Sequence, residues 1–457
     1  MSLSGETIKL TFGAGIQIDH ASYAVKERLK ETLTLPNPLF ARMLRMGKST
    51  FGTPKTFSYF KNIGRGVLVP RGVETRLMAF FGKTGVAVAV DNQRVNIPRE
   101  RVLAPCTKLR PYQEEAVQTA IASSIGILQL GTGAGKTLTA CEIVARLPVT
   151  ALILVPNTAI LNQFVQEFKT FYSIGVGVVG DGTKDIQDIT IATFQSLQAD
   201  PLLARTLCER TSLLIVDECQ GAVSDKRANL LWRFKASHIY GLSATPYRSS
   251  DDGRSDAVGF FFGPVLFSHE GLKLKPRVEV IQTDCALPVG DYQKMSEMLS
   301  THTERNSLIA GIAAGEALTG RRVLILTKRI KHAAALYTLL QHMPGVLHIE
   351  ADNADKNALL QTLRLGLNDF SILIGTTSLL AVGVDVPSLD TLVIACDLKS
   401  DVLTAQSAGR ILRLFEGKTD PIIFDLYDNK NPIFARQFFA RRTVYESKGW
   451  DIHTKYD

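Results

Sequence analysis

The chain has 457 residues, of which 45% are hydrophobic, and its formal net charge is +8. This length supports a large buried core and about three domains. No apolar run approaches the roughly 20 residues that cross a bilayer, residues 1–14 lack the basic start and long apolar core of a signal peptide, and the six cysteines are scattered without a Cys-x-x-Cys pair. These features argue against a membrane protein, a disulfide-stabilised secreted domain and a zinc site, and favour an intracellular protein.

The positive charge is concentrated in the first hundred residues. They contain 15 Lys and Arg against 7 Asp and Glu, whereas the rest of the chain contains 37 of each and is neutral. Residues 42–76 alone carry eight basic side chains against the single acid Glu74; they are Arg42, Arg45, Lys48, Lys55, Lys61, Arg65, Arg71 and Arg76. Clustered Lys and Arg neutralise phosphates and release counterions, so we expect this region to bind nucleic acid, with the first five residues as contacts. The aromatic residues among them either stack on bases or belong to the core, and we favour the core for Phe51, Phe57, Tyr59 and Phe60.

The N-terminal region has mixed strand and helix patterns. Strand-like alternation and helical periodicity occur in turn along it, at residues 7–14, 21–33, 73–81 and 85–90. Residues 98–105 begin and end with proline and resemble a linker. A small α+β domain is therefore expected before this linker.

A glycine-rich stretch, Gly131-Thr132-Gly133-Ala134-Gly135-Lys136-Thr137, lies between an apolar run at 125–130 and a helical pattern at 138–147. A loop of this composition between a strand and a helix is the context of a phosphate-binding loop. Its glycines let successive backbone N–H groups face phosphate oxygens, and the helix N-terminus adds partial positive charge. Lys136 would then reach the β- and γ-phosphates, and the Thr137 hydroxyl would bind Mg²⁺.

The strict spacing of such loops places a glycine at position 130, where this chain has Leu130. A glycine-rich turn with an incidental lysine is therefore the alternative interpretation of the loop considered alone. Upstream, Leu109-Arg110-Pro111-Tyr112-Gln113 begins a helix. A glutamine at this distance from the loop can bind the edge of an adenine base through two hydrogen bonds, although most such glutamines are surface residues.

Acidic residues follow a buried strand pattern downstream of the loop. The apolar stretch 212–216 ends at Asp217-Glu218-Cys219-Gln220, and the carboxyl end of a strand is where α/β sheets place ligand chemistry. We expect Asp217 to hold Mg²⁺ and Glu218 to position or deprotonate an attacking water. An acidic loop without function is the alternative, and the glycine-rich loop earlier in the chain counts against it. Ser243-Ala244-Thr245 ends a further strand and could relay the state of the γ-phosphate.

A second α/β pattern begins after a polar insert at 249–256 and contains no phosphate-binding loop. Its helix 404–414 carries Arg410 and Arg413 three residues apart, hence on one face, where two guanidiniums can clamp a γ-phosphate. A surface arginine pair is the alternative. The last helix, 432–449, is basic and aromatic, and we expect it either to pack on the body of the protein or to contact nucleic acid.

Taken in order, these stretches resemble the motifs of the superfamily 2 helicases over residues 109–428. The stretches that carry the resemblance are Leu-Arg-Pro-Tyr-Gln (109–113), the glycine-rich loop (131–137), Leu-Val-Pro-Asn (154–157), Ala-Thr-Phe-Gln-Ser-Leu (192–197), Asp-Glu-Cys-Gln (217–220), Ser-Ala-Thr (243–245), Leu-Ile-Leu-Thr (324–327), Gly383 with Asp385, and Gln406-x-x-Gly409-Arg410-x-x-Arg413. Each is modest alone, but the ordered set is highly specific. Gln220 departs from the pattern, since many members of the superfamily have His there.

The resemblance implies an α/β fold with two tandem RecA-like domains, a small N-terminal α+β domain and a C-terminal helix. Residues 1–103 would be the basic DNA-binding domain, 104–266 the ATP-binding RecA-like domain and 267–457 the second RecA-like domain. ATP and Mg²⁺ are the implied cofactors, with nucleotide contacts from Arg110, Gln113, residues 131–137, Asp217, Glu218, Gly383, Asp385, Gln406, Arg410 and Arg413. The implied nucleic-acid contacts of the motor are Pro156, Asn157, Thr193, Thr327 and Thr376.

Within the superfamily, the chain most resembles the phage UvsW-type branch-migration DNA helicases and, more distantly, the XPB group. The common features are Arg-Pro-Tyr-Gln (110–113), the basic N-terminal domain, and a basic C-terminal helix after Phe-Asp-Leu-Tyr-Asp (424–428). The resemblance implies a monomeric, cytoplasmic enzyme of a bacterium or a phage-infected cell that remodels forks and Holliday junctions without membrane contact. An RNA helicase shares the motor motifs and is the alternative enzyme. A non-catalytic nucleic-acid scaffold is disfavoured by the intact ATP-site residues, and a restriction-system motor would need further domains.

Overall fold

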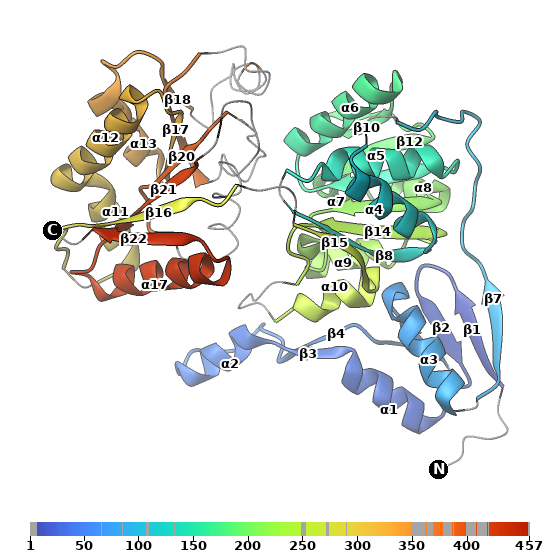
Figure 1. Ribbon diagram of the computed structural model, residues 1–457. Coiled ribbons are helices and arrows are strands. Elements are labelled where there is room, and N and C mark those ends of the chain that lie inside the picture. The colour runs from blue at the N-terminus through green and yellow to red at the C-terminus, as the bar shows by residue number, and fades with distance from the viewer. Residues whose placement is uncertain are drawn as a thin grey trace. The chain divides into compact units, whose positions relative to one another are not determined.

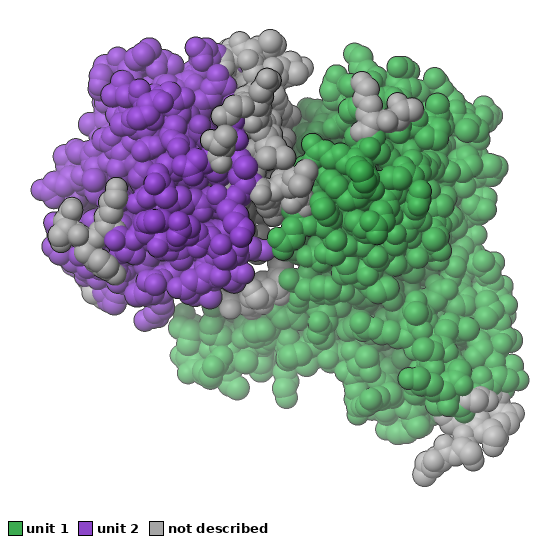
Figure 2. Space-filling view, in the orientation of Figure 1, with its two compact units in different colours: residues 1–270 green, residues 271–457 purple. Residues whose placement is uncertain are grey.

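The computed structural model (Figure 1) describes residues 7–64, 66–84, 86–106, 109–131, 133–247, 253–270, 274–288, 290–349, 362, 369–377, 386, 388–398, 408, 418 and 420–455. The chain forms two compact units, residues 1–270 and residues 271–457 (Figure 2). Each unit contains a mostly parallel sheet with helices packed on it, so the predicted α/β fold with two RecA-like domains is confirmed. Among the described helices, none combines the length and apolar character that crossing a bilayer requires.

An eight-stranded sheet, ordered β11-β10-β12-β9-β13-β14-β8-β15, is the centre of the first unit. Its neighbouring strands are parallel except for β10 and β11. The strands are β8 (Ile125–Leu130), β9 (Ala151–Val155), β10 (Gly177–Gly180), β11 (Thr183–Lys184), β12 (Ile189–Thr193), β13 (Leu213–Asp217), β14 (His238–Ser243) and β15 (Val265–His269). All residues of β9 and β13 are buried, as expected for strands covered on both faces.

Two sets of helices cover the two faces of this sheet. One core contains Ile153 of β9 with residues of α4 (Pro111–Ile121), α5 (Lys136–Arg146) and α6 (Thr158–Tyr172). The other contains Leu154 of the same strand with residues of α7 (Phe194–Ala199), α8 (Pro201–Arg210), α9 (Asp225–Leu231) and α10 (Ser255–Phe262). Successive side chains of a strand point to opposite faces, which explains the division. A 3₁₀ turn, η2 (Cys219–Gly221), follows β13.

The N-terminal region forms a smaller sheet, ordered β5-β6-β2-β1-β7, and a separate two-stranded ribbon of β3 and β4. The strands are β1 (Ile8–Phe12), β2 (Ile16–Asp19), β3 (Thr34–Pro36), β4 (Thr56–Ser58), β5 (Lys61–Ile63), β6 (Gly66–Val69) and β7 (Val88–Asn92). The helices are α1 (Tyr23–Thr32), α2 (Pro38–Arg45), η1 (Arg71–Val73) and α3 (Glu74–Thr84). We call residues 34–58, which include the ribbon and α2, the basic arm. Helix α2 has no buried residue and stands clear of both sheets of its unit (Figure 1).

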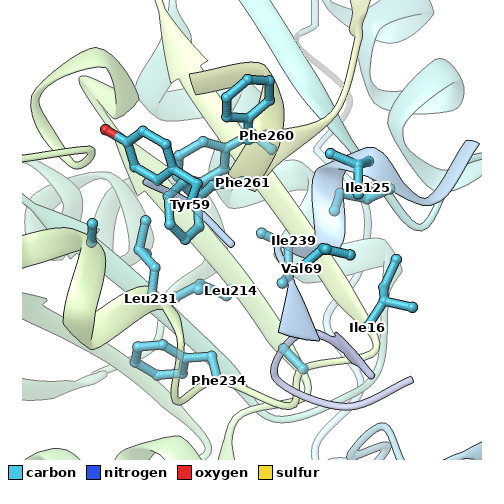
Figure 3. Close-up of a cluster of buried hydrophobic side chains, with 14 of the residues drawn as sticks. Ile16, Tyr59, Val69, Ile125, Leu214, Leu231, Phe234, Ile239, Phe260 and Phe261 are labelled. Carbon is cyan, nitrogen blue, oxygen red and sulfur yellow. The ribbon is translucent and has the colours of Figure 1, made fainter. Parts of the chain in front are cut away.

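The small N-terminal sheet and the large sheet share one hydrophobic core. Ile16 and Val69 belong to the same cluster as Ile125 (Figure 3). Tyr59 packs edge-on against Phe260 of α10, with their ring centroids 5.7 Å apart. The boundary predicted after residue 103 is therefore crossed by a continuous core. The boundary predicted after residue 266 falls just before the division between the two units at 270 and 271.

Arg71 is an internal residue of this shared core. Only 2% of its surface is exposed, and its Nη1 donates to the carbonyl oxygens of Gly13 at 3.3 Å and Ala236 at 2.6 Å. Burial, with a smaller contribution from Arg94, lowers the pKa of Arg71 to about 10. Arg71, which is not among the five predicted contacts, is therefore not available to nucleic acid. Its guanidinium joins the N-terminal region to the large sheet.

The second unit contains a seven-stranded parallel sheet, ordered β18-β19-β17-β20-β21-β16-β22. The strands are β16 (Arg277–Gln282), β17 (Val323–Thr327), β18 (Val346–His348), β19 (Ile372–Thr376), β20 (Thr391–Ile394), β21 (Ile422–Tyr427) and β22 (Asp451–Lys455). The described helices of this unit are α11 (Tyr292–Thr301), α12 (Thr303–Leu318), α13 (Ile330–Leu340) and α17 (Pro432–Ser447).

Helix α17 packs on this sheet through a buried ion pair. The Arg441 guanidinium donates to both carboxylate oxygens of Asp425 on β21, with a shortest distance of 2.7 Å, and the Tyr445 hydroxyl donates to the same carboxylate at 2.8 Å. Phe434 and Phe438 are also buried. Of the two alternatives for the last helix, the structure therefore supports packing for the face that carries Arg441.

Candidate nucleotide-binding and nucleic-acid-binding sites

The glycine-rich loop connects β8 to the N-terminus of α5. Gly133 and Gly135 have φ angles of 80° and 75°, a region that glycine adopts without a steric penalty. A Cβ on Gly131 would lie 2.0 Å from the carbonyl oxygen of Glu270, so no side chain fits at that position either. Leu130 is the last residue of β8 and is fully buried in the core, which explains why an apolar residue occupies it. Thr132 lies outside the described residues.

Gln113 and Tyr112 hold the loop from the start of α4. Gln113 is 4% exposed, its Nε2 donates to the carbonyl oxygen of Ala134 at 3.2 Å, and its Oε1 accepts from the backbone N–H of Arg110 at 2.9 Å. The Tyr112 hydroxyl donates to the same Ala134 oxygen at 3.2 Å. In this structure the Gln113 amide therefore supports the loop backbone, and its contact with adenine stays a prediction.

The two acids predicted to serve catalysis lie at the carboxyl end of β13. Parallel strands β13, β14 and β8 are consecutive in the sheet, so Asp217, Ser243 and the glycine-rich loop lie along one sheet edge. Lys136 Nζ is 3.5 Å from Glu218 Oε1, and Gln220 Nε2 donates to Glu218 Oε2 at 2.5 Å. Gln220, the residue that departs from the family pattern, thus contacts the predicted catalytic acid directly.

Glu218 is held in an unusual backbone conformation. Its φ of 49° and ψ of 50° lie in the left-handed region, which costs a non-glycine residue of order 1–3 kcal/mol. Such strain persists where surrounding contacts over-determine it, and it is concentrated at functional sites. The contacts with Lys136 and Gln220 are two such constraints.

Asp217 and Thr137 have the chemistry of a Mg²⁺ site. Asp217 is 6% exposed, and burial, followed by the neighbouring Glu218 charge, raises its pKa to about 7. A carboxylate that is disfavoured by burial is stabilised by a cation, and Mg²⁺ is usually held by one or two protein oxygens together with phosphates and water. The Thr137 hydroxyl accepts a hydrogen bond from Gln163 Nε2 at 2.9 Å. These residues fit Mg²⁺ with ATP, and Gln163 is a contact that no sequence motif indicated.

The predicted nucleic-acid contacts of the motor differ in exposure. Pro156 and Asn157 are partly exposed after β9, and Asn157 caps α6 by accepting from the Ile160 N–H at 3.0 Å. Three of the predicted side chains are buried, namely Thr193, Thr327 and Thr376. Because these three side chains are buried, the predicted nucleic-acid contact stays a prediction for the segments that contain them and not for their hydroxyl groups. Besides Thr132, five predicted nucleotide-site residues lie outside the described residues, namely Gly383, Asp385, Gln406, Arg410 and Arg413.

The five basic side chains predicted to bind nucleic acid are all exposed, namely Arg42, Arg45, Lys48, Lys55 and Lys61. The first four lie on the basic arm, while Lys61 lies 4.4 Å from the ring centroid of Trp232. Phe51, between α2 and β4 of the arm, is 98% exposed, so assigning it to the core was wrong. Tyr59 is buried, and Phe57 and Phe60 pack partly buried against the core, as expected.

The chain matches two family models, described as "Type III restriction enzyme, res subunit" over residues 107–248 and "Helicase conserved C-terminal domain" over residues 304–415. The first match covers the glycine-rich loop and the Asp217–Glu218 pair, and the second covers the two arginines at 410 and 413. The chain belongs to the superfamily 2 helicases. Members of this superfamily use ATP to act on nucleic acid, which agrees with the arrangement of the loop and the acids.

The relatives of this chain include DNA helicases and a putative RNA helicase. The ATP-dependent DNA helicase uvsW of Enterobacteria phage T4 is 24% identical over 409 residues, which cover 79% of this chain and 80% of that protein. The DNA 3'-5' translocase XPB2 of Sulfurisphaera tokodaii is 32% identical over 160 residues, only 35% of either chain. A putative ATP-dependent RNA helicase of Acanthamoeba polyphaga mimivirus is 21% identical over 432 residues, which cover 87% of this chain and 79% of that protein.

Proposed function

We propose that this protein is an ATP-dependent DNA helicase or translocase that unwinds or branch-migrates forks and Holliday junctions. One observation carries the proposal: the first unit has its ATP-site groups along one edge of its sheet and also presents an exposed arm with four basic side chains. The proposed ATP site and the basic arm thus belong to one compact unit. The similarity to the phage T4 DNA helicase supports DNA as the nucleic acid.

The residues of the first unit would act on ATP as follows. Lys136 would exchange its contact with Glu218 for the β- and γ-phosphates, and Glu218 would orient the attacking water. Thr137 and Asp217 would hold Mg²⁺, which would supply positive charge to the phosphate oxygens. Arg410 and Arg413 are proposed to complete the charge stabilisation from the second RecA-like domain.

We propose that two surfaces bind the nucleic acid. Pro156 and Asn157 contact the backbone of one strand, which makes stepping independent of sequence. The basic arm binds duplex at the branch point through phosphate contacts, which also carry no sequence information.

Lys136→Ala is the direct test of the ATPase. We expect loss of turnover by about 100-fold or more, because the developing phosphate charge loses its nearest cation. DNA affinity should stay near that of the wild type, because the basic arm is unchanged. Lys169→Ala, at an exposed position of α6, is the matched control. Turnover at the wild-type rate in Lys136→Ala would contradict the assignment.

The nucleic acid is tested by stimulation of that ATPase. Rates are measured with duplex DNA, forked DNA, Holliday junctions and structured RNA at one ionic strength. The proposal expects the largest stimulation with the branched DNA substrates, followed by ATP-dependent branch migration of a labelled junction. An RNA helicase is the second candidate, favoured by the RNA helicase relative that spans most of the chain, and stronger stimulation by RNA would select it. Monomeric behaviour is part of the proposal and is checked by sedimentation.

A further inference from the structure

Gln163 on α6 contacts the hydroxyl group that is predicted to bind Mg²⁺. Its Nε2 donates to Thr137 Oγ1 at 2.9 Å, and both side chains are partly buried. We propose that Gln163 is a positioning residue, which orients the Thr137 hydroxyl for the metal ion of the nucleotide site. This inference rests on the proposed ATPase function and adds a residue that none of the helicase motifs in the sequence assigned.

The physical argument concerns the rotation of a hydroxyl group. A threonine hydroxyl has one donor hydrogen and two acceptor lone pairs, and it rotates to suit its neighbours. An N–H that donates into one lone pair leaves the second lone pair for a metal ion and directs the hydroxyl hydrogen elsewhere. Mg²⁺ requires near-ideal octahedral geometry, so an unoriented ligand is costly. Partners that orient a ligand commonly change metal affinity by roughly 10- to 100-fold.

Gln163 is well placed for this role because α6 is firmly anchored. The neighbouring Leu161 and Phe164 are each 1% exposed in the core beneath the sheet. Asn157 caps the helix through the Ile160 N–H. A side chain presented from a packed helix keeps its position better than one presented from a loop. The same helix is capped by Asn157, a predicted nucleic-acid contact, so the residue that contacts Thr137 belongs to an element that is also predicted to contact nucleic acid.

The test is the Mg²⁺ dependence of nucleotide binding in Gln163→Met. Methionine keeps the length of the side chain and removes its N–H donor. The affinity of the full-length protein for a fluorescent ADP analogue is titrated with Mg²⁺ and with EDTA. We expect the gain in affinity that Mg²⁺ provides to fall about 10-fold, while the affinity in EDTA is unchanged. Gln166→Met, at an exposed position of the same helix, should match the wild type in both conditions.

A double-mutant cycle separates positioning from packing. If Gln163 acts through the Thr137 hydroxyl, adding Gln163→Met to Thr137→Ala should cause no further loss of Mg²⁺-dependent affinity. Full additivity, or equal losses with Mg²⁺ and with EDTA, would overturn the proposal. If Gln163→Met unfolds more readily than Gln166→Met, Gln163→Ala is carried through the same cycle. Wild-type protein that neither hydrolyses ATP nor binds it with Mg²⁺ would defeat the proposed function itself, whereas an active wild type with an unaltered Gln163→Met defeats this inference alone.

Discussion

The basic arm and helix α17 are similar in composition and differ in burial. Both combine arginines with aromatic side chains. On the arm, Arg42 and Arg45 are exposed and Phe51 is 98% exposed. On α17, the side chain of Arg441 is 4% exposed and binds Asp425, and Phe438 is buried. The same residue types therefore form a solvent-facing cation surface in one place and a packed structural contact in the other.

The difference lies in the partners that each segment finds. Asp425, at 0% side-chain exposure, needs a cation, and Arg441 provides it together with a hydrogen bond to the Leu398 carbonyl. Burial of such a pair is tolerated only when both charges are paired and hydrogen-bonded. The basic arm contains no acidic residue, so its cations remain hydrated and available for phosphates. A basic aromatic segment is thus a candidate for nucleic-acid binding only where its arginines form no ion pair with a buried acid.

Removing the buried cation should have the largest effect. Arg441→Met leaves the Asp425 charge buried without its partner, and we expect a loss of about 3–5 kcal/mol in the free energy of unfolding. The measurement is urea unfolding followed by circular dichroism. Arg442→Met, which breaks only the exposed pair with Glu446 on the same helix, should cost about 1 kcal/mol or less. Equal costs for the two variants would show that the buried ion pair of α17 stabilises the fold no more than an exposed pair does.

Removing charge from the arm should change binding and leave stability alone. The combined variant Arg42→Ala, Arg45→Ala, Lys48→Ala and Lys55→Ala is expected to lower affinity for forked DNA. The slope of log affinity against log salt should fall by about 0.9 for each phosphate that the variant no longer neutralises. Fluorescence anisotropy over a salt series measures both quantities. The charge-matched control replaces four exposed basic residues of the first unit, namely Lys169, Arg205, Lys226 and Lys235. If the control lowers the slope as much, the arm has no special role.

Phe51→Ala should have the smallest effect on folding. Replacing an exposed side chain without core contacts changes the free energy of unfolding by no more than about 0.5 kcal/mol. If Phe51 stacks on an unpaired base, binding to a fork with a single-stranded gap should weaken by about 1–3 kcal/mol. Phe438→Ala provides the contrast, since truncating a buried phenylalanine costs about 3–5 kcal/mol of stability. Unchanged fork affinity in Phe51→Ala would leave the arm as a purely electrostatic surface.

Much of the fold was predictable because its signals are local. The apolar run at 125–130 is β8 as predicted, and the buried strand expected at 212–216 is β13. Strand β22, Asp451–Lys455, was missed because its sequence is largely polar and its ladder partner, β16, is remote in the chain. Helix α2 was also missed, because its eight residues make few helical turns over which a periodicity can be recognised.

The sequence by itself indicated the nucleotide site that we propose for this protein. A phosphate-binding loop is contiguous, so its glycines, Lys136 and Thr137 are visible as one pattern, and Asp217 and Glu218 follow directly from the end of a strand. Only the tertiary structure showed which charges are buried and which side chains support the loop. Arg71 is internal because of Ala236, a residue 165 positions away, and Gln163 reaches Thr137 from another helix. Burial and long-range hydrogen bonds depend on residues that are distant in the chain, and no local pattern records them.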